Sequence, residues 1–185
     1  MGSFFSGADV TQDQGARSLS YYFTTDVAYI NRDIVAELVE ESTRRGRCNA
    51  RICLHTSPDA NFHEMIIMEY RGKYFRPHKH LKKGESCHII EGEVAMFAFD
   101  NVGKVTHARI AGRNGNLICR VGIDQWHTVI PITEYAIYHE SKPGPFLGPS
   151  DSIYPDWAPD GTDEEEALVF MEALIQEAEE HSRSI

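Results

Sequence analysis

The stretch 72–92, GKYFRPHKHLKKGESCHIIEG, contains the pattern that decides the fold. His78 and His80 lie two residues apart, and residues two apart in an extended strand point to the same face of a sheet. Glu85 follows the second histidine by five residues, after a turn at residues 82–84. Two imidazoles and one carboxylate that converge on one point suit a divalent transition metal. The stretch therefore predicts a metal site at the junction of two strands.

Glycines at both ends complete the spacing Gly-x5-His-x-His-x4-Glu-x6-Gly, which resembles the first motif of the cupin family without a mismatch. Cupins carry a second motif that ends in a further histidine, and His127 follows Glu85 by 42 residues. This half of the pattern is degenerate, because Asp124 and Pro131 stand where the family has Gly and Asn. Aspartate tolerates the left-handed conformation that a glycine would take there. The resemblance implies His127 as the fourth ligand; a structural histidine is the alternative, with His55 and His139 as the next candidate ligands.

Three histidines and one glutamate leave two adjacent positions of an octahedron open. Such a donor set suits Fe(II), Mn(II), Ni(II) or Zn(II), and geometry does not choose among them. The open positions would take a bidentate substrate, or one substrate and dioxygen. A closed structural zinc site is disfavoured.

Bulk composition sets limits on the class of protein. A chain of 185 residues suffices for one domain with a sizeable core. Its net charge of −10 argues against nucleic acid and against anionic membrane surfaces as partners. The four cysteines lack CxxC spacing, and we identify neither a signal peptide nor a membrane-spanning run. We therefore expect a cytoplasmic protein with reduced thiols.

The rest of the chain predicts an all-β core with a helix at each end. Residues 1–20 have no periodicity and are predicted to be a flexible tail, and residues 21–185 to be a single domain. Asn31 or Asp33 caps an apolar helical stripe that Gly46 ends, and Thr162 opens a C-terminal helix over 162–180. Between them, short apolar runs predict strands near 49–56, 63–71, 73–79, 85–91, 93–99, 104–110, 117–122, 126–131 and 134–140. These strands predict a jelly roll over about 48–141, the double-stranded β-helix of the cupins.

The Pro- and Gly-rich loop 141–161 carries Phe146, Tyr154 and Trp157, which are too apolar to be left in water together. The loop is either a lid over the metal or a strap that pins the C-terminal helix to the sheet. The position of Trp157, five residues before Thr162, favours the strap. Strand 63–71 is apolar on both faces, so its outer face needs a helix or a partner subunit, and we expect a homodimer.

Strand alternation suggests further ligand-binding residues. Tyr74 and Arg76 share the face of His78 and are candidate catalytic or substrate-positioning groups. Arg76 either binds an anion in the lumen or pairs with an acid at its mouth. Arg51 and His55 share one face of an earlier strand, which either lines the pocket or faces solvent.

Two other positions, Glu140 and Cys87, complete the candidates. Glu140 is a candidate hydrogen-bond partner of a ligand residue, and Cys87 either faces the cavity or packs as an inert thiol. His63, His88 and His107 belong to no constellation.

Further segments resemble one cupin branch, the WbuC family: 51–55, 65–86, 99–105, 126–131, 134–146 and 155–159. The resemblance covers about residues 48–160. It implies a cupin metalloprotein associated with bacterial surface-polysaccharide (O-antigen, lipopolysaccharide) biosynthesis, without an established reaction. We predict a metal-dependent enzyme, an isomerase or epimerase or a dioxygenase, that acts on a sugar, a sugar-nucleotide or another small polar metabolite. The alternatives are a non-catalytic metal-dependent binding or sensing module and a metal-free sugar isomerase, and the intact ligand set speaks against the latter.

Overall fold

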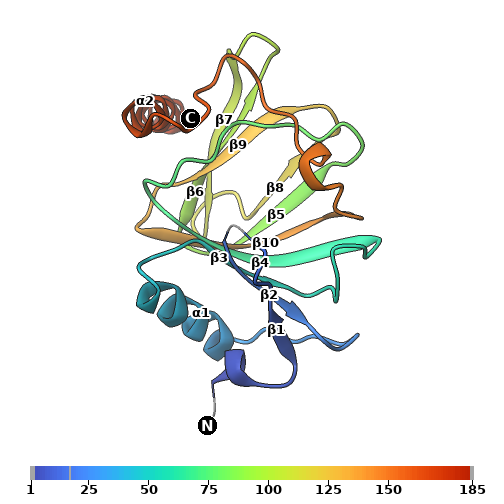
Figure 1. Cartoon of the computed structure of the whole chain (residues 1–185). Coiled ribbons are helices and arrows are strands. Elements are labelled where there is room, and N and C mark those ends of the chain that lie inside the picture. The colour runs from blue at the N-terminus through green and yellow to red at the C-terminus, as the bar shows by residue number, and fades with distance from the viewer. Residues whose placement is uncertain (1–2, 17, 184–185) are drawn as a thin grey trace.

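Two β-sheets face each other, and each carries a helix on its outer surface (Figure 1). The computed structural model describes residues 3–16 and 18–183. The larger sheet has the strand order β1-β2-β3-β4-β10-β5-β8, and the smaller has the order β7-β6-β9. Strand β10 therefore lies between β4 and β5, which are neighbours in sequence, as a jelly roll requires. The elements are η1 (Phe4–Ser6), β1 (Val10–Gln12), β2 (Leu19–Phe23), α1 (Arg32–Arg44), β3 (Ala50–Cys53), β4 (Phe62–Tyr70), β5 (Glu85–Glu91), β6 (Glu93–Phe99), β7 (Val105–Gly112), β8 (Ile118–Val121), β9 (Trp126–Pro131), β10 (Tyr135–Pro143), η2 (Gly148–Ser150) and α2 (Glu164–Arg183).

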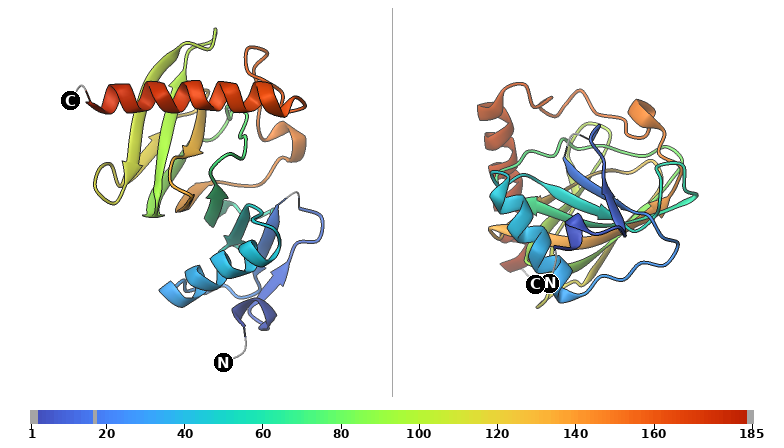
Figure 2. Two further views of the ribbon diagram at one scale, coloured as in Figure 1. Left: turned by 90° about the vertical axis from the view of Figure 1, so that its left-hand side faces the viewer. Right: turned by 60° about the horizontal axis from the view of Figure 1, so that its bottom comes forward.

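The lumen between the sheets holds one apolar cluster, which includes Cys87, Ile89 and Tyr138. Strand alternation sends the intervening residues to the outer faces, where two further clusters form. Helix α1 covers the outer face of β2–β4, and α2 lies across the smaller sheet (Figure 2). The predicted fold class, a cupin jelly roll with flanking helices, is confirmed.

The outer face of β4 is covered within the chain. Its residues Ile66 and Met68 are 4% and 0% exposed and pack in the cluster that contains Leu38 of α1. The exposed apolar face that suggested a homodimer is therefore absent from the described part of this strand. The dimer itself stays a prediction.

The predicted flexible tail is wrong for residues 3–16 and 18–20; residues 1, 2 and 17 lie outside the described residues, as do 184–185 of the predicted domain. Strand β1 pairs with β2, and β2 pairs in parallel with β3. The ring centroids of Phe4 and Phe23 are 5.7 Å apart, and those of Phe5 and Tyr21 are 4.5 Å apart. A few apolar residues anchor this polar segment to the sheet, although they follow no clear period.

The predicted strand 73–79 is also wrong, except for two isolated bridges at its end. His78 pairs with His127, and Lys79 pairs with Ile153. Pro77 has no N–H to donate to a neighbouring strand, so the ladder cannot extend back toward Lys73. Helix α2 begins at Glu164 rather than at residue 162, because the Asp163 side chain accepts hydrogen bonds from the N–H groups of Glu165 and Glu166.

Among the described residues, no helix is long and apolar enough to cross a membrane. All four cysteines are free thiols.

The predicted loop 141–161 begins too early, because β10 extends to Pro143. The rest of this segment, called the 141–161 loop below, leads from the end of β10 along the rim of the jelly roll toward α2. Trp157 packs at 5.0 Å from the ring of Phe99 and edge-on at 6.1 Å from Trp126. Phe146 and Tyr154, in contrast, are 55% and 50% exposed. The prediction that all three aromatic side chains are buried is therefore wrong for these two, and Trp157 is partly buried against the apolar cluster of the smaller sheet. The loop thus has the tryptophan anchor expected of a strap.

Trp157→Ala should lower the free energy of unfolding by about 3–5 kcal/mol, because it leaves a cavity between the sheet and the loop. Denaturant unfolding would measure this loss. The matched control Phe146→Ala removes an exposed ring and should cost no more than about 0.5 kcal/mol. Equal losses in the two variants would contradict the strap.

Candidate metal centre

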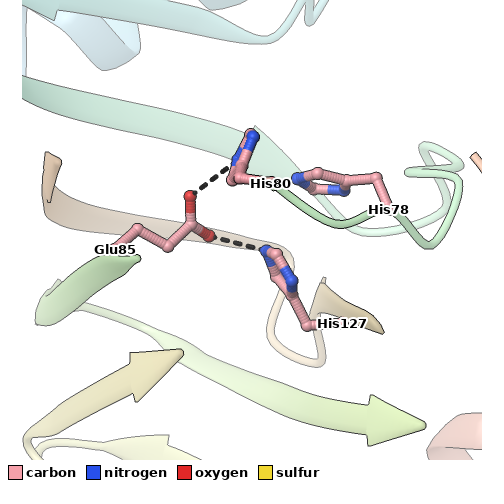
Figure 3. A group of neighbouring side chains, drawn as sticks. All are labelled: His78, His80, Glu85 and His127. Carbon is pink, nitrogen blue, oxygen red and sulfur yellow. Dashed lines mark hydrogen bonds and ion pairs between the residues drawn. The ribbon is translucent and has the colours of Figure 1, made fainter. Parts of the chain in front are cut away.

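Three segments bring the four predicted ligands together (Figure 3). His78 sits on the segment before β5 and forms a two-way main-chain bridge with His127 of β9, with both N–H···O distances 2.9 Å. His80 follows in the same segment, and Glu85 is the first residue of β5. The ligand atoms of these four residues all lie within 4.8 Å of one another.

The Glu85 carboxylate lies between two of the imidazoles. Its Oε1 is 2.8 Å from His127 Nε2, and its Oε2 is 3.2 Å from His80 Nε2. The ring of His78 closes the group at 4.4 Å from the ring of His127. His78 is partly exposed, whereas the other three side chains are buried.

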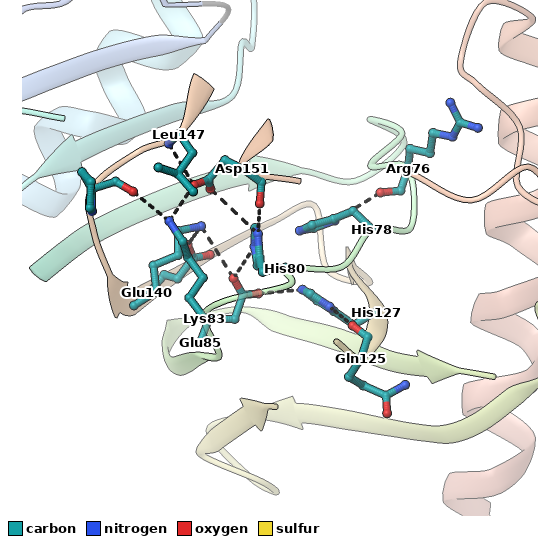
Figure 4. Close-up of polar contacts among 12 residues, drawn as sticks. Arg76, His78, His80, Lys83, Glu85, Gln125, His127, Glu140, Leu147 and Asp151 are labelled. Atoms are coloured by element: carbon teal, nitrogen blue, oxygen red, sulfur yellow. Dashed lines mark hydrogen bonds and ion pairs between the residues drawn. The ribbon is translucent and has the colours of Figure 1, made fainter. Parts of the chain in front are cut away.

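Each imidazole is oriented by a main-chain carbonyl on its far side (Figure 4). The Nδ1–H groups donate to three different residues: His78 to Arg76 O at 3.3 Å, His80 to Asp151 O at 2.5 Å, and His127 to Gln125 O at 2.8 Å. A carbonyl only accepts, so each Nδ1 carries a hydrogen, and each Nε2 is the nitrogen that can bind a second proton or a metal ion at the centre of the group. This is the orientation that metal-binding histidines need.

Burial and mutual contact set the charges of these groups. Burial, followed by the neighbouring His127, lowers the pKa of His78 to about 3, which keeps this imidazole neutral. Burial disfavours charge on Glu85, but hydrogen bonds with His127 and His80 outweigh it and hold the pKa of Glu85 well below its usual value. Burial likewise opposes charge on His127, but the hydrogen bond with Glu85 raises its pKa.

The donor set fits a divalent cation. A lone pair on Nε2 that faces a carboxylate oxygen at 2.8 or 3.2 Å is repulsive unless a proton or a cation lies between them. A metal ion satisfies both contacts at once and leaves the Nδ1 hydrogen bonds intact. These residues therefore form a candidate site for a divalent metal.

A partly buried cation borders this group on the lumen side. Lys142 of β10 places its Nζ 2.8 Å from Glu140 Oε1 and 3.6 Å from Glu85 Oε2. Glu85, Cys87 and Glu140 also have ligand atoms within 4.8 Å of one another. Because Lys142 already supplies a positive charge between the two carboxylates, we assign no second metal to them.

The 141–161 loop is tied directly to His80. Asp151, whose carbonyl accepts from His80, pairs through its carboxylate with Lys83 Nζ at 2.5 Å, and both side chains are 5% exposed. Lys83 also donates to Pro145 O at 3.0 Å, and Leu147 N donates to Asp151 Oδ1 at 3.1 Å. The loop thus orients a ligand residue, in addition to anchoring Trp157.

Two of the predicted substrate-positioning residues point elsewhere, because residues 73–77 are not a strand. Tyr74 donates its hydroxyl to Pro159 O at 2.7 Å and packs edge-on against Phe170 of α2. Arg76 donates to Pro155 O at 2.5 Å and lies over the ring of Tyr154, away from the four ligands (Figure 4). The prediction that they line the metal lumen is wrong; both hold the loop.

The other candidates lie on or near the lumen face at different distances from the centre. Glu140 reaches it through Lys142. Arg51 lies opposite Ile67 in the register, on the lumen face, and no acidic side chain in the described part of the chain pairs with it. His55 instead stacks on His63 with the ring centroids 4.1 Å apart, and burial lowers its pKa to about 4. It does not join the ligand group.

Sequence reasoning missed Lys142, Lys83 and Asp151. Alternation would have found Lys142, since it stands two residues after Glu140 on one strand. Lys83 is indistinguishable from its exposed neighbour Lys82, and Asp151 lies in a loop without period.

Comparison with known proteins identifies one family model. A model described as a domain of unknown function (DUF6016) matches residues 30–111. No curated protein matches the chain.

Solved structures with some similarity include CapF bound to the inhibitor 3-isopropenyl-tropolone (12% identity, TM-score 0.47, 57% of this chain and 31% of that chain). Oxalate decarboxylase from Bacillus subtilis is 14% identical, with a TM-score of 0.46 over 58% of this chain and 27% of that one. Procruciferin, the 11S globulin of Brassica napus, is 8% identical, with a TM-score of 0.40 over 50% and 22%. The chain thus spans less than a third of the length of each.

The class of protein follows from the strand order and the ligand geometry. The chain has the cupin fold and carries a His3Glu cluster suited to a divalent metal ion.

Lys83→Met should weaken metal binding by about 10–100-fold, because the loop carbonyl that orients His80 loses its anchor. Competition with a chelator of known affinity would measure the change. The matched control is Lys82→Met, which alters an exposed lysine in the same turn. Unchanged affinity in Lys83→Met would show that the ion pair with Asp151 does not orient the ligand.

Proposed function

We propose that this protein binds one divalent transition metal through His78, His80, Glu85 and His127 and uses it to hold a small polar ligand. One observation carries the proposal: three imidazoles are each fixed at Nδ1 by a carbonyl, and all three turn Nε2 toward the neighbourhood of a single carboxylate. A donor set of three nitrogens and one oxygen is compatible with Fe(II), Mn(II), Ni(II) or Zn(II).

We further propose that the protein is an enzyme. The metal, when bound, would supply Lewis-acid or redox chemistry. The charged pair of Lys142 and Glu140 lies beside the metal-ligand residues. A metal site with a purely structural role does not require such a pair. A non-catalytic binding or sensing module is the alternative, and turnover in the presence of substrate would separate the two.

The resemblance to the WbuC family supports a substrate from surface-polysaccharide (O-antigen) biosynthesis, such as a sugar or a sugar-nucleotide. The reaction would then be an isomerisation, an epimerisation or a dioxygenation. A cytoplasmic location accords with the four free thiols. A homodimer belongs to the same proposal and rests on the cupin resemblance.

The metal content of single variants tests the ligand set. His78→Ala, His80→Ala and His127→Ala should each reduce bound metal far below one ion per chain, and Glu85→Gln should weaken binding less. Elemental analysis of protein purified without a tag would measure this. His88→Ala is the matched control, because that histidine is exposed on the outer face of β5. A His127→Ala protein with full metal content would remove this histidine from the ligand set.

Metal binding should also release protons. Below the raised pKa of His127 its imidazole holds a proton at Nε2, which a metal ion must displace. Apparent affinity should therefore increase as the pH rises through that pKa, and the proton release should vanish above it. Titration calorimetry in buffers of different ionisation enthalpy would count the protons. A release independent of pH between about 6 and 9 would contradict this linkage.

A further inference from the structure

Five charged side chains at and beside the candidate metal centre form ion pairs with one another; Arg51, on the lumen face of β3, forms none with them in the described part of the chain. Lys142 lies between Glu85 and Glu140, and Lys83 pairs with Asp151. Three carboxylates and two ammonium groups leave one negative charge. A divalent ion, held by neutral histidines, would turn that balance into one positive charge. All five side chains are at most 16% exposed, so water screens this charge poorly.

The two lysines differ in what they can still bind. Lys83 makes two hydrogen bonds, to Asp151 at 2.5 Å and to Pro145 O at 3.0 Å, and its charge is compensated by the first. Lys142 makes one close contact within the described part of the chain, to Glu140 at 2.8 Å, while Glu85 lies at 3.6 Å. An ammonium group has three donors. Lys142 therefore retains donors on the side of the metal centre.

Resting on the proposed metal site, we propose that Lys142 is its anion-recognition group and that the ligand is a small 2-oxo or 2-hydroxy carboxylate. One negative charge on the ligand makes the loaded site neutral. Two neighbouring oxygens would suit a divalent ion that His78, His80, Glu85 and His127 hold and that keeps room for further ligands. The class includes sugar acids, so it narrows the substrate proposed above from sugars in general to acidic ones.

The charge of Glu140 should affect carboxylate binding in the direction opposite to that of Lys142. The Glu140 carboxylate takes one of the three donors of the Lys142 ammonium and lowers the positive charge of the site by one. Removing the charge of Glu140 should therefore strengthen carboxylate binding, whereas removing the charge of Lys142 should weaken it. A residue pair that merely supported the fold would weaken binding in both cases.

The experiment uses the full chain loaded with Co(II), whose visible absorption reports changes at the metal. Pyruvate is the anionic probe, and methyl pyruvate is its neutral match. Lys142→Met should raise the dissociation constant for pyruvate by roughly 10–100-fold, as expected for loss of a charge-assisted hydrogen bond. Lys142→Arg should restore most of the affinity, and Glu140→Gln should lower the dissociation constant. Methyl pyruvate binding should not change, and Lys73→Met, at an exposed lysine, is the control.

The outcomes separate this inference from the proposed function. Failure of the parent protein to bind one Co(II) refutes the metal site before any ligand is added. If Co(II) binds but pyruvate does not, the ligand class is wrong. If Lys142→Met binds pyruvate like the parent, or Glu140→Gln also binds it more weakly, Lys142 is not the recognition group. Should Lys142→Met fail to fold, the Lys142→Arg and Glu140→Gln titrations still decide the point.

Discussion

The orientation of three imidazoles is the constraint on which the rest of this site depends. A histidine on a strand fixes only the direction of its Cα–Cβ bond, and the ring still rotates unless one nitrogen is held. His78 and His127 use carbonyls two residues before them, so their rings are fixed by local backbone. His80 uses the carbonyl of Asp151, which is 71 residues away. The orientation of the His80 ring therefore depends on the position of a loop that is distant in the sequence.

That loop is held at both ends by different kinds of interaction. Near the site, Asp151 and Lys83 form a buried ion pair whose burial is offset by further hydrogen bonds to Leu147 N and Pro145 O. Near α2, Trp157 packs on Phe99, and a Cβ on Gly103 would lie only 2.7 Å from the indole ring. Gly103 also has a positive φ of 86°, so the hairpin turn needs glycine for both reasons. The two predicted roles of the loop, lid or strap, do not cover what it does, since the same segment packs on the sheet and orients the metal-ligand residue His80.

The sequence predicted what depends on local spacing. His78, His80 and Glu85 are set by a short pattern, and Asp124 takes the left-handed φ of 61° that its place in the second motif requires. The prediction of strand 73–79 failed because a single residue, Pro77, interrupts the alternation of the strand. Pro77 ends the strand that was to carry Tyr74 and Arg76 into the lumen. Prediction also failed for β1 and β2, whose pairing with β3 depends on contacts between distant segments. No local pattern reports that Asp151 will meet Lys83.

The absence of the predicted strand at residues 73–77 has a structural consequence. Because residues 73–77 leave the sheet, Tyr74 and Arg76 are released from the lumen and bind carbonyls of the loop, at Pro159 and Pro155. The segment that carries His78 and His80 is then attached to the loop on two sides: through these two side chains, and through the bridge between Lys79 and Ile153. A displacement of the loop would move the carbonyl that orients His80 and the segment that carries it together. The loop carbonyl and the segment that carries His80 are thus attached to each other at several points, which makes this carbonyl a well-defined partner for a metal ligand.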